Sequence, residues 1–336
     1  MRKLAVYSIL GALALLMAVP PCSSGASPDD SDQPLSARSR PIWNPFSRPA
    51  KSNPADQLAY ADTLRERGSK KALKQYRALP LRWPDAVEAP VAQRAYAELL
   101  ADKGKMFKAF EEYQVLVDLY SGRFAEYDEV LDRQYELAMQ AMRHRRAKFL
   151  FLPGFVAPEQ SLPLFEELLE NGPHWERAPE VQYQMGEIHY LSDEYELAII
   201  AYERGLHTYP DSVVAERCAY GRAYCLYLLA EENQASVSAQ KEAWAAWSLY
   251  LMKFPEGEDV RLAKEYRNAV HRRMAKSAYE QALFYERVAR KPQAALMAYR
   301  EFTKEFPSSE WTGVAESRID SLSKELKSEG DSGHDQ

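Results

Sequence analysis

The stretch AIIAYERGLHTYPDS, residues 198–212, places an alanine, an aromatic residue and a proline at fixed intervals. Ala198 is followed by Tyr202 four residues later and by Pro210 after eight more. Residues four apart lie on one face of a helix, so the small side chain and the ring face the same neighbour. Proline ends a helix because it lacks a backbone N–H and restricts the residue before it. The stretch therefore predicts a helix that packs closely against a partner and stops just before residue 210.

The same spacing occurs in six places along the chain. The alanine position holds Ala72, Ala109, Ser161, Ala198, Ala243 and Ala295. The aromatic position holds Tyr76, Tyr113, Phe165, Tyr202, Trp247 and Tyr299. The proline position holds Pro84, Ser121, Pro173, Pro210, Pro255 and Pro307. A motif that recurs in this way is the mark of a repeat architecture.

A second amphipathic helix precedes each copy, with a small residue where two helices would cross: Ala97, Ala138, Gly186 and Gly221 are the candidates. These intervals resemble the tetratricopeptide repeat, a helix–turn–helix unit of 34 residues. Here the alanine positions step by 37, 52, 37, 45 and 52 residues, which indicates longer helices or loops. One long step contains residues 143–160, and another a long helix over about 259–289. We expect an all-α, right-handed α-solenoid of about six such repeats over residues 55–326.

The N-terminus has the features of an export signal, which we assign to residues 1–26. Met1-Arg2-Lys3 is basic, and the uncharged run Leu4 to Val19 is shorter than the roughly 20 residues that span a bilayer. Cleavage after Ala26 would release a soluble protein, whereas acylation of Cys22 would make a lipoprotein. An uncleaved signal-anchor is the third alternative. All three place the folded part outside the cytoplasm.

Both flanks of the repeats are polar. Residues 23–54 hold six prolines and eight serines, so we expect a disordered Pro/Ser-rich tether over 27–54. We also expect a disordered tail over 327–336.

The composition argues against nucleic-acid binding, and the cysteine spacing argues against a disulfide bond. The formal net charge of −6 and the pI of about 5.7 lack the basic footprint of a nucleic-acid-binding protein. Cys218 and Cys225 lie seven residues apart on one expected helix, about 10 Å along its axis, too far for a disulfide. Both are therefore expected to be buried small side chains.

We find no catalytic, cofactor or metal motif in the sequence. A phosphate-binding glycine loop, an HExxH motif and a nucleophile elbow are absent. The six histidines are scattered, and none has a second His or Cys three or four residues away. We therefore expect no enzyme activity, no cofactor and no metal.

Binding features are better supported. In such solenoids the first helix of each unit lines a groove, and this geometry directs a set of side chains toward it, where tyrosines could hold an extended peptide. The predicted groove residues are Arg94, Glu98, Tyr135, Met139, Tyr183, Glu187 and Tyr190. The alternative is that some of them pack between the units.

A second candidate surface is the insertion RHRRAKFLFLPGFV, residues 143–156. A basic run precedes an apolar one, and such a loop could contact anionic lipid or a partner protein. The residues concerned are Arg143, Arg145, Arg146, Phe149, Phe151 and Phe155. The alternative is that the apolar residues pack into the third repeat and the arginines are solvated.

The chain combines a signal, a cysteine, a Pro/Ser-rich tether and irregular repeats, the last of which reads AYEQALFYERVARKPQAALMAYREFTKEFPSSEW at residues 278–311. In these features it resembles the BamD family of outer-membrane β-barrel assembly factors. The resemblance covers roughly residues 55–325. It implies a lipid-anchored, non-enzymatic scaffold on the periplasmic side of the outer membrane. It also implies that C-terminal repeats bind the periplasmic domains of the barrel-inserting subunit and that N-terminal repeats bind unfolded outer-membrane proteins. A soluble periplasmic adaptor for peptidoglycan, division or other envelope machinery is the alternative.

Overall fold

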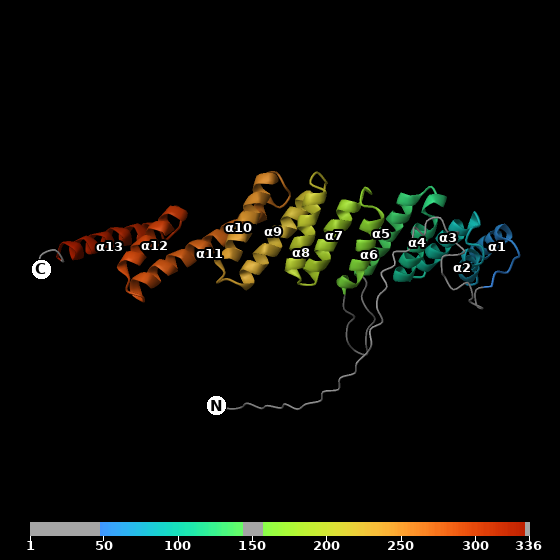
Figure 1. The fold of residues 1–336 in the computed structure, drawn as a ribbon, viewed down its shortest axis with the longest axis horizontal. Coiled ribbons are helices and arrows are strands. Elements are labelled where there is room, and N and C mark those ends of the chain that lie inside the picture. Colours follow the sequence, from blue (N-terminus) through green and yellow to red (C-terminus); the bar gives the residue numbers. More distant parts are fainter. Residues whose placement is uncertain (1–47, 144–156, 333–336) are drawn as a thin grey trace, which may run out of the picture.

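The computed structural model describes residues 48–143 and 157–332, which form thirteen α-helices and two short 3-10 turns. Figure 1 shows the helices side by side in one elongated row, with α1 at one end and α13 at the other. The first helices of the hairpins, here called the A helices, are α1 (Pro54–Glu66), α3 (Glu88–Ala101), α5 (Tyr127–Arg143), α7 (Ala178–Leu191), α9 (Ala215–Glu232) and α11 (Val260–Arg287). The second helices, the B helices, are α2 (Ala72–Arg82), α4 (Met106–Tyr120), α6 (Leu162–Asn171), α8 (Tyr195–Thr208), α10 (Val237–Lys253) and α12 (Pro292–Glu305). The predicted all-α repeat fold of six hairpins is confirmed, and α13 (Thr312–Ser332) follows the last hairpin.

The recurring alanines and aromatic residues form the core of this row. All six residues at the alanine position and all six at the aromatic position are buried, each at most 2% exposed. Ser161, the one serine at the alanine position, lies in the 3-10 turn η5 (Pro158–Ser161) just before α6 and donates a hydrogen bond to the Pro158 carbonyl. Burial of whole aromatic rings between neighbouring hairpins is the main source of stability in such an array.

The prolines end the B helices as predicted. Each B helix whose motif contains proline stops two residues before it, as α8 stops at Thr208 before Pro210. In the second unit, where serine replaces proline, α4 continues directly into the 3-10 turn η4 (Ser121–Arg123).

Tyr202 explains why glycine occurs where the A helices cross. Its ring lies against Gly186 of α7 on one side and Gly221 of α9 on the other, and a Cβ atom at Gly221 would be 2.6 Å from the Cζ of Tyr202. Only a residue without a side chain lets both helices approach this ring. The other two predicted crossing residues, Ala97 and Ala138, are completely buried.

Four of the turns from an A helix to its B helix contain a residue with positive φ. In the first of them, the Ser69 N–H donates to the Leu64 carbonyl at 2.9 Å, which caps α1 after a left-handed residue. The residues with positive φ in these turns are Gly68, Gly104, Asp193 and Arg290. The first two turns use glycine, which adopts this conformation without steric cost, and the other two do not.

The ends of the solenoid differ slightly from the expected boundaries. The Ala50 and Lys51 N–H groups donate to the buried Gln57 side chain at 2.9 and 3.0 Å, so the chain already contacts α1 before Pro54. At the other end, α13 extends to Ser332, into the segment predicted as a tail. The predicted long helix is confirmed as α11.

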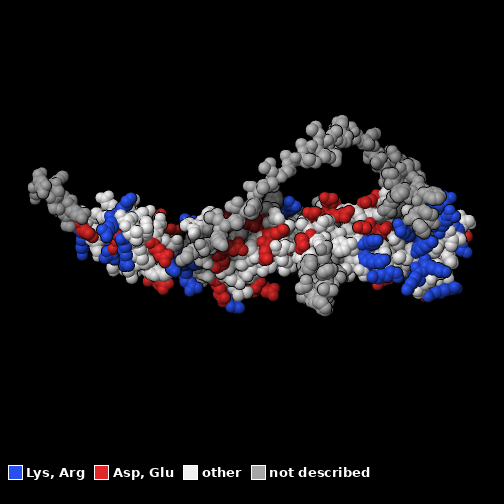
Figure 2. All heavy atoms as spheres, turned by 90° about the horizontal axis from the view of Figure 1, so that it is seen from below, with Lys and Arg blue, Asp and Glu red and all other residues white. Residues whose placement is uncertain are grey.

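Charge is distributed unevenly along the row. Residues 48–82 hold nine Lys or Arg and three Asp or Glu, whereas residues 158–232 hold four Lys or Arg and fifteen Asp or Glu. Figure 2 shows Lys and Arg side chains gathered at the N-terminal end, at the right of the view, and more acidic side chains over the middle. The solenoid therefore presents a basic end and an acidic centre.

Candidate protein-binding surfaces

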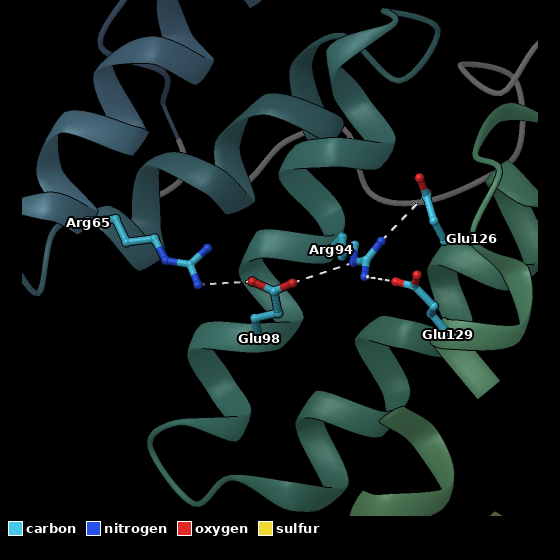
Figure 3. A network of polar contacts seen from close by, with 5 residues as sticks. All are labelled: Arg65, Arg94, Glu98, Glu126 and Glu129. Atoms are coloured by element: carbon cyan, nitrogen blue, oxygen red, sulfur yellow. Dashed lines mark hydrogen bonds and ion pairs between the residues drawn. The ribbon is translucent and has the colours of Figure 1, made fainter. Parts of the chain in front are cut away.

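The first three A helices are joined by a network of ion pairs. Arg65 of α1 pairs with Glu98 of α3 at 2.9 Å, and Arg94 pairs with the other oxygen of Glu98 at 3.5 Å. Arg94 also reaches Glu129 of α5 at 2.8 Å and Glu126, just before α5, at 3.6 Å (Figure 3). The Glu129 hydrogen bond raises the pKa of Arg94. Two predicted groove residues, Arg94 and Glu98, thus serve to link consecutive hairpins.

These contacts join residues about one repeat apart in sequence. Arg65 and Glu98 are 33 residues apart, and Arg94 and Glu129 are 35 apart. Farther along, Arg217 of α9 pairs with Glu180 of α7, 37 residues earlier, at 3.2 Å. Equivalent positions of neighbouring A helices therefore lie next to each other on one continuous face, which we call the A face.

Two predicted groove tyrosines on this face, Tyr135 and Tyr183, each have an arginine guanidinium close to the ring. The Arg177 guanidinium is 5.5 Å from the ring centre of Tyr135, which also packs edge-on against Phe165 and Trp175. The Arg217 guanidinium is 3.9 Å from the ring centre of Tyr183. Tyr135 is 8% exposed, so it belongs to the core, whereas Tyr183 is partly exposed. Met139, a partly buried side chain, packs against the same core as Tyr135.

Glu187, another predicted groove residue, accepts the hydroxyl hydrogen bond of Tyr202 at 2.6 Å. The arrangement repeats in the first and last hairpins. Tyr76 donates to Asp62 at 2.6 Å, and Tyr299 donates to Glu286 at 2.7 Å. Burial and these carboxylates raise the pKa of all three tyrosines. These carboxylates therefore accept the hydrogen bonds that the hydroxyl groups of the buried tyrosines need. Because Glu187 has this structural role, it is only partly available for a ligand.

The remaining predicted groove residue, Tyr190, begins a row of partly buried tyrosines across three A helices. Its ring centre is 6.0 Å from that of Tyr224 in α9, and Tyr224 is 5.4 Å from Tyr266 in α11. Tyr227 of α9 packs 4.8 Å from Tyr266. We call these four residues the tyrosine row. Of these four, only Tyr190 is among the predicted groove residues, although Tyr224 follows it by 34 residues, one tetratricopeptide period.

An arginine closes the row at its C-terminal end. The Arg273 guanidinium lies 5.4 Å from the ring centre of Tyr227 and pairs with Glu231 at 2.5 Å. Partly exposed phenol rings offer a flat apolar surface with a polar tip, which suits an extended polypeptide and needs little side-chain ordering. The row can therefore hold a peptide segment across the hairpins.

A groove between α10, α11 and α12 was not predicted. Its volume is about 400 Å³, and its wall includes the apolar side chains of Met274, Ala278, Ala298, Phe302 and Phe306. At its edge, Val237 is 52% exposed and Met297 is 72% exposed. Lys241 and Glu305 lie 4.0 Å apart among the lining residues. Three helices contribute to the groove, so no single sequence motif identifies it. An apolar hollow with a charged edge suits a protein partner.

Two predicted sites lie mainly outside the described residues. Of the insertion, only Arg143 at the exposed end of α5 is described, and Arg145, Arg146, Phe149, Phe151 and Phe155 fall outside. The predicted lipid anchor Cys22 also falls outside.

The cysteines that the structure describes are buried and free, as predicted. Burial raises the pKa of both the Cys218 and Cys225 thiols to about 12, so neither is a reactive nucleophile. Within residues 48–143 and 157–332, no group of three or more His, Cys, Asp or Glu side chains is placed to hold a metal ion. In the same ranges, every helix is too short or too polar to cross a bilayer.

Comparison with known proteins gives one family match. The YfiO family model, described as an outer membrane lipoprotein, matches residues 159–329, just over half of the chain. No curated protein matches the chain significantly. Similar solved structures include the C-terminal part of a TPR repeat-containing protein from Cytophaga hutchinsonii, at 16% identity over 79% of this chain and 88% of that one, with a TM-score of 0.36. Another is a tetratricopeptide repeat protein from Parabacteroides merdae, at 13% identity over 80% of this chain and 98% of that one, with a TM-score of 0.31.

Proposed function

Because the chain belongs to the YfiO family of outer membrane lipoproteins, we propose that it is a BamD-like scaffold of outer-membrane protein assembly, which binds other polypeptides and catalyses no reaction. The observation that carries the proposal is the family match over residues 159–329, the span from η5 to α13. The groove between α10, α11 and α12 and the tyrosine row both lie within that span.

The groove is the surface that we assign to the partner subunit. It offers apolar contact area at Met297 and Val237 together with charged groups at Lys241 and Glu305, the combination found in interfaces with an apolar centre and a polar rim. The partner there is the periplasmic part of the barrel-inserting subunit of the assembly complex.

The A face is the surface that we assign to unfolded outer-membrane proteins. Its partly exposed tyrosines tolerate many sequences, because ring faces and hydroxyl groups contact a peptide without demanding one side chain. Such a surface suits a chain that has not yet folded and whose strands are still extended.

Acylation of Cys22 would hold the scaffold at the inner surface of the outer membrane. Mass spectrometry of the mature N-terminus tests this location: an acylated Cys22 supports it, and a free N-terminal Ser27 supports a soluble periplasmic adaptor instead.

Affinity purification from a detergent-solubilised cell envelope tests the function. The proposal expects recovery of the barrel-inserting subunit with the wild-type protein. Met297→Lys should reduce that recovery by placing a charge at the groove. Met252→Lys is the matched control, because Met252 is 73% exposed on α10 but does not line the groove. Failure of the wild-type protein to recover that subunit would contradict the proposal.

A further inference from the structure

A set of lysines lies at one edge of the first two hairpins, where each A helix turns into its B helix. Lys70 and Lys71 belong to the turn before α2, and Lys74 lies in the first turn of α2. Lys103 and Lys105 belong to the turn before α4, and Lys108 lies in the first turn of α4. All six are exposed. We call these six lysines the basic edge.

The two turns are uncovered. A Cβ atom at Gly68 or Gly104 would meet no other atom within 4 Å, so there is open space beside both glycines in the described chain. The ion pairs described for these hairpins join Arg65 and Arg94 to carboxylates and use none of the six lysines. The positive charge of the basic edge is therefore available to a partner.

The positive charge is spread over two successive turns and is carried mainly by lysines, with Arg67 in the first turn and the carboxylates of Glu66 and Asp102 beside them. A lysine acts as a hydrated point charge, without the planar fork by which arginine recognises one carboxylate or phosphate. An array of this kind suits a surface with many anionic groups, and each lysine close to an anionic leaflet adds to the attraction within a Debye length of about 8–10 Å. The acidic centre, residues 158–232, would be repelled by the same surface.

We propose that the basic edge binds the anionic lipid headgroups of the membrane beside which the protein works, so that the first two hairpins lie against the bilayer. This deepens the proposed function and rests on its location at the outer membrane. Residue 48 follows Cys22 by 26 residues, which span at most about 90 Å when extended. An anchored chain therefore keeps the basic edge within reach of the bilayer.

Lysine acetylation in the presence of vesicles tests the proposal. The mature protein is mixed with vesicles of phosphatidylcholine alone or with added phosphatidylglycerol, and the acetylation rate of each lysine is followed by mass spectrometry. The six lysines of the basic edge should react several-fold more slowly on the anionic vesicles, and high salt should abolish the difference. Lys291, Lys304 and Lys324, exposed near the other end of the solenoid, should react equally on both. Equal rates for the basic edge on both kinds of vesicle would overturn the proposal.

Charge-reversal variants distinguish binding through the basic edge from a general electrostatic attraction of the whole protein to the vesicles. Lys70→Glu/Lys71→Glu/Lys74→Glu should remove the protection of Lys103, Lys105 and Lys108, while Lys291→Glu/Lys304→Glu/Lys324→Glu, with the same change in charge, should retain it. Circular dichroism verifies that both variants are folded. Protection that appears only when envelope proteins are present would identify an acidic protein as the occupant and overturn the proposal.

The pull-down of the barrel-inserting subunit is independent of these vesicles. Its recovery by the Lys70→Glu/Lys71→Glu/Lys74→Glu variant, together with a negative vesicle result, would reject the lipid contact and leave the proposed function in place.

Discussion

The ring of Tyr202 in α8 occupies the space that a side chain at Gly186 in α7 would need. A methyl group at Gly186 would overlap with three atoms of the ring. Tyr202 is 1% exposed and its hydroxyl is held by Glu187, so the ring has little freedom to move away. This contact fixes how closely the two helices of the fourth hairpin pack.

Gly186→Ala should therefore destabilise the protein by about 1–3 kcal/mol, the usual cost of overpacking a core. Urea unfolding monitored by circular dichroism measures the change. Gly313→Ala in α13 is the control, because a Cβ there meets nothing within 4 Å, and it should be neutral or slightly stabilising. Equal midpoints for Gly186→Ala and the wild type would show that the ring is not held as described.

Glu286 should make stability depend on pH at the C-terminal end. Burial opposes the charged form, but hydrogen bonds from Arg318 and Tyr299 outweigh it and hold the pKa of Glu286 below its ordinary value. A lowered folded-state pKa stabilises the protein above the unfolded-state value of about 4.3, and this stabilisation is lost as the pH falls through the folded-state pKa.

Glu286→Gln should cost about 1–3 kcal/mol at pH 7, because it removes charge-assisted hydrogen bonds. It should also flatten the fall in stability below about pH 4.3 relative to the wild type. Urea midpoints of both proteins between neutral and acidic pH measure the difference. Parallel curves would mean that Glu286 does not contribute to the acid sensitivity.

Cys218 and Cys225 should resist alkylation in the folded protein. With a pKa of about 12, each thiol is almost entirely protonated at pH 8, and both side chains are at most 1% exposed. Mass spectrometry after iodoacetamide treatment should find both unmodified in buffer and both modified in urea. Rapid modification in buffer would reveal local opening of α9.

Replacing Arg290 with glycine should stabilise the folded protein. It adopts φ 51° in the turn before α12, a conformation that costs energy for residues with a Cβ atom. Arg290→Gly should therefore stabilise the protein by about 0.5–1 kcal/mol. The reverse change, Gly104→Ala at φ 67° in the equivalent turn of the second hairpin, should destabilise it. Thermal melting of both variants checks the opposite signs.

The repeat pattern predicts the fold well because, each time the spacing occurs, it describes the packing face and the end of a single helix. The alanine, the ring and the proline specify a face and an end of the same helix, so Ala198, Tyr202 and Pro210 could be interpreted without any distant contact. The crossing glycine Gly186 could be found for the same reason.

The candidate surfaces are harder to predict, because their residues meet only after the hairpins stack. Tyr190 was found and Tyr224 was missed although it lies one 34-residue period later, whereas Tyr266 follows Tyr224 by 42 residues and is not reached by that step. The predicted groove residues Tyr135 and Glu187 are largely used within the core and its polar contacts. The groove depends on the packing of α10, α11 and α12, which no one segment specifies.

Site-specific photo-crosslinking in living cells shows whether the groove between α10, α11 and α12 contacts the barrel-inserting subunit. A photoreactive amino acid is placed at Met297, at the edge of the groove, and in a separate strain at the equally exposed Met252, outside it. We expect an adduct with the barrel-inserting subunit from position 297 and little or none from position 252. No adduct with that subunit from position 297, or equal adducts from both positions, would contradict the proposed contact.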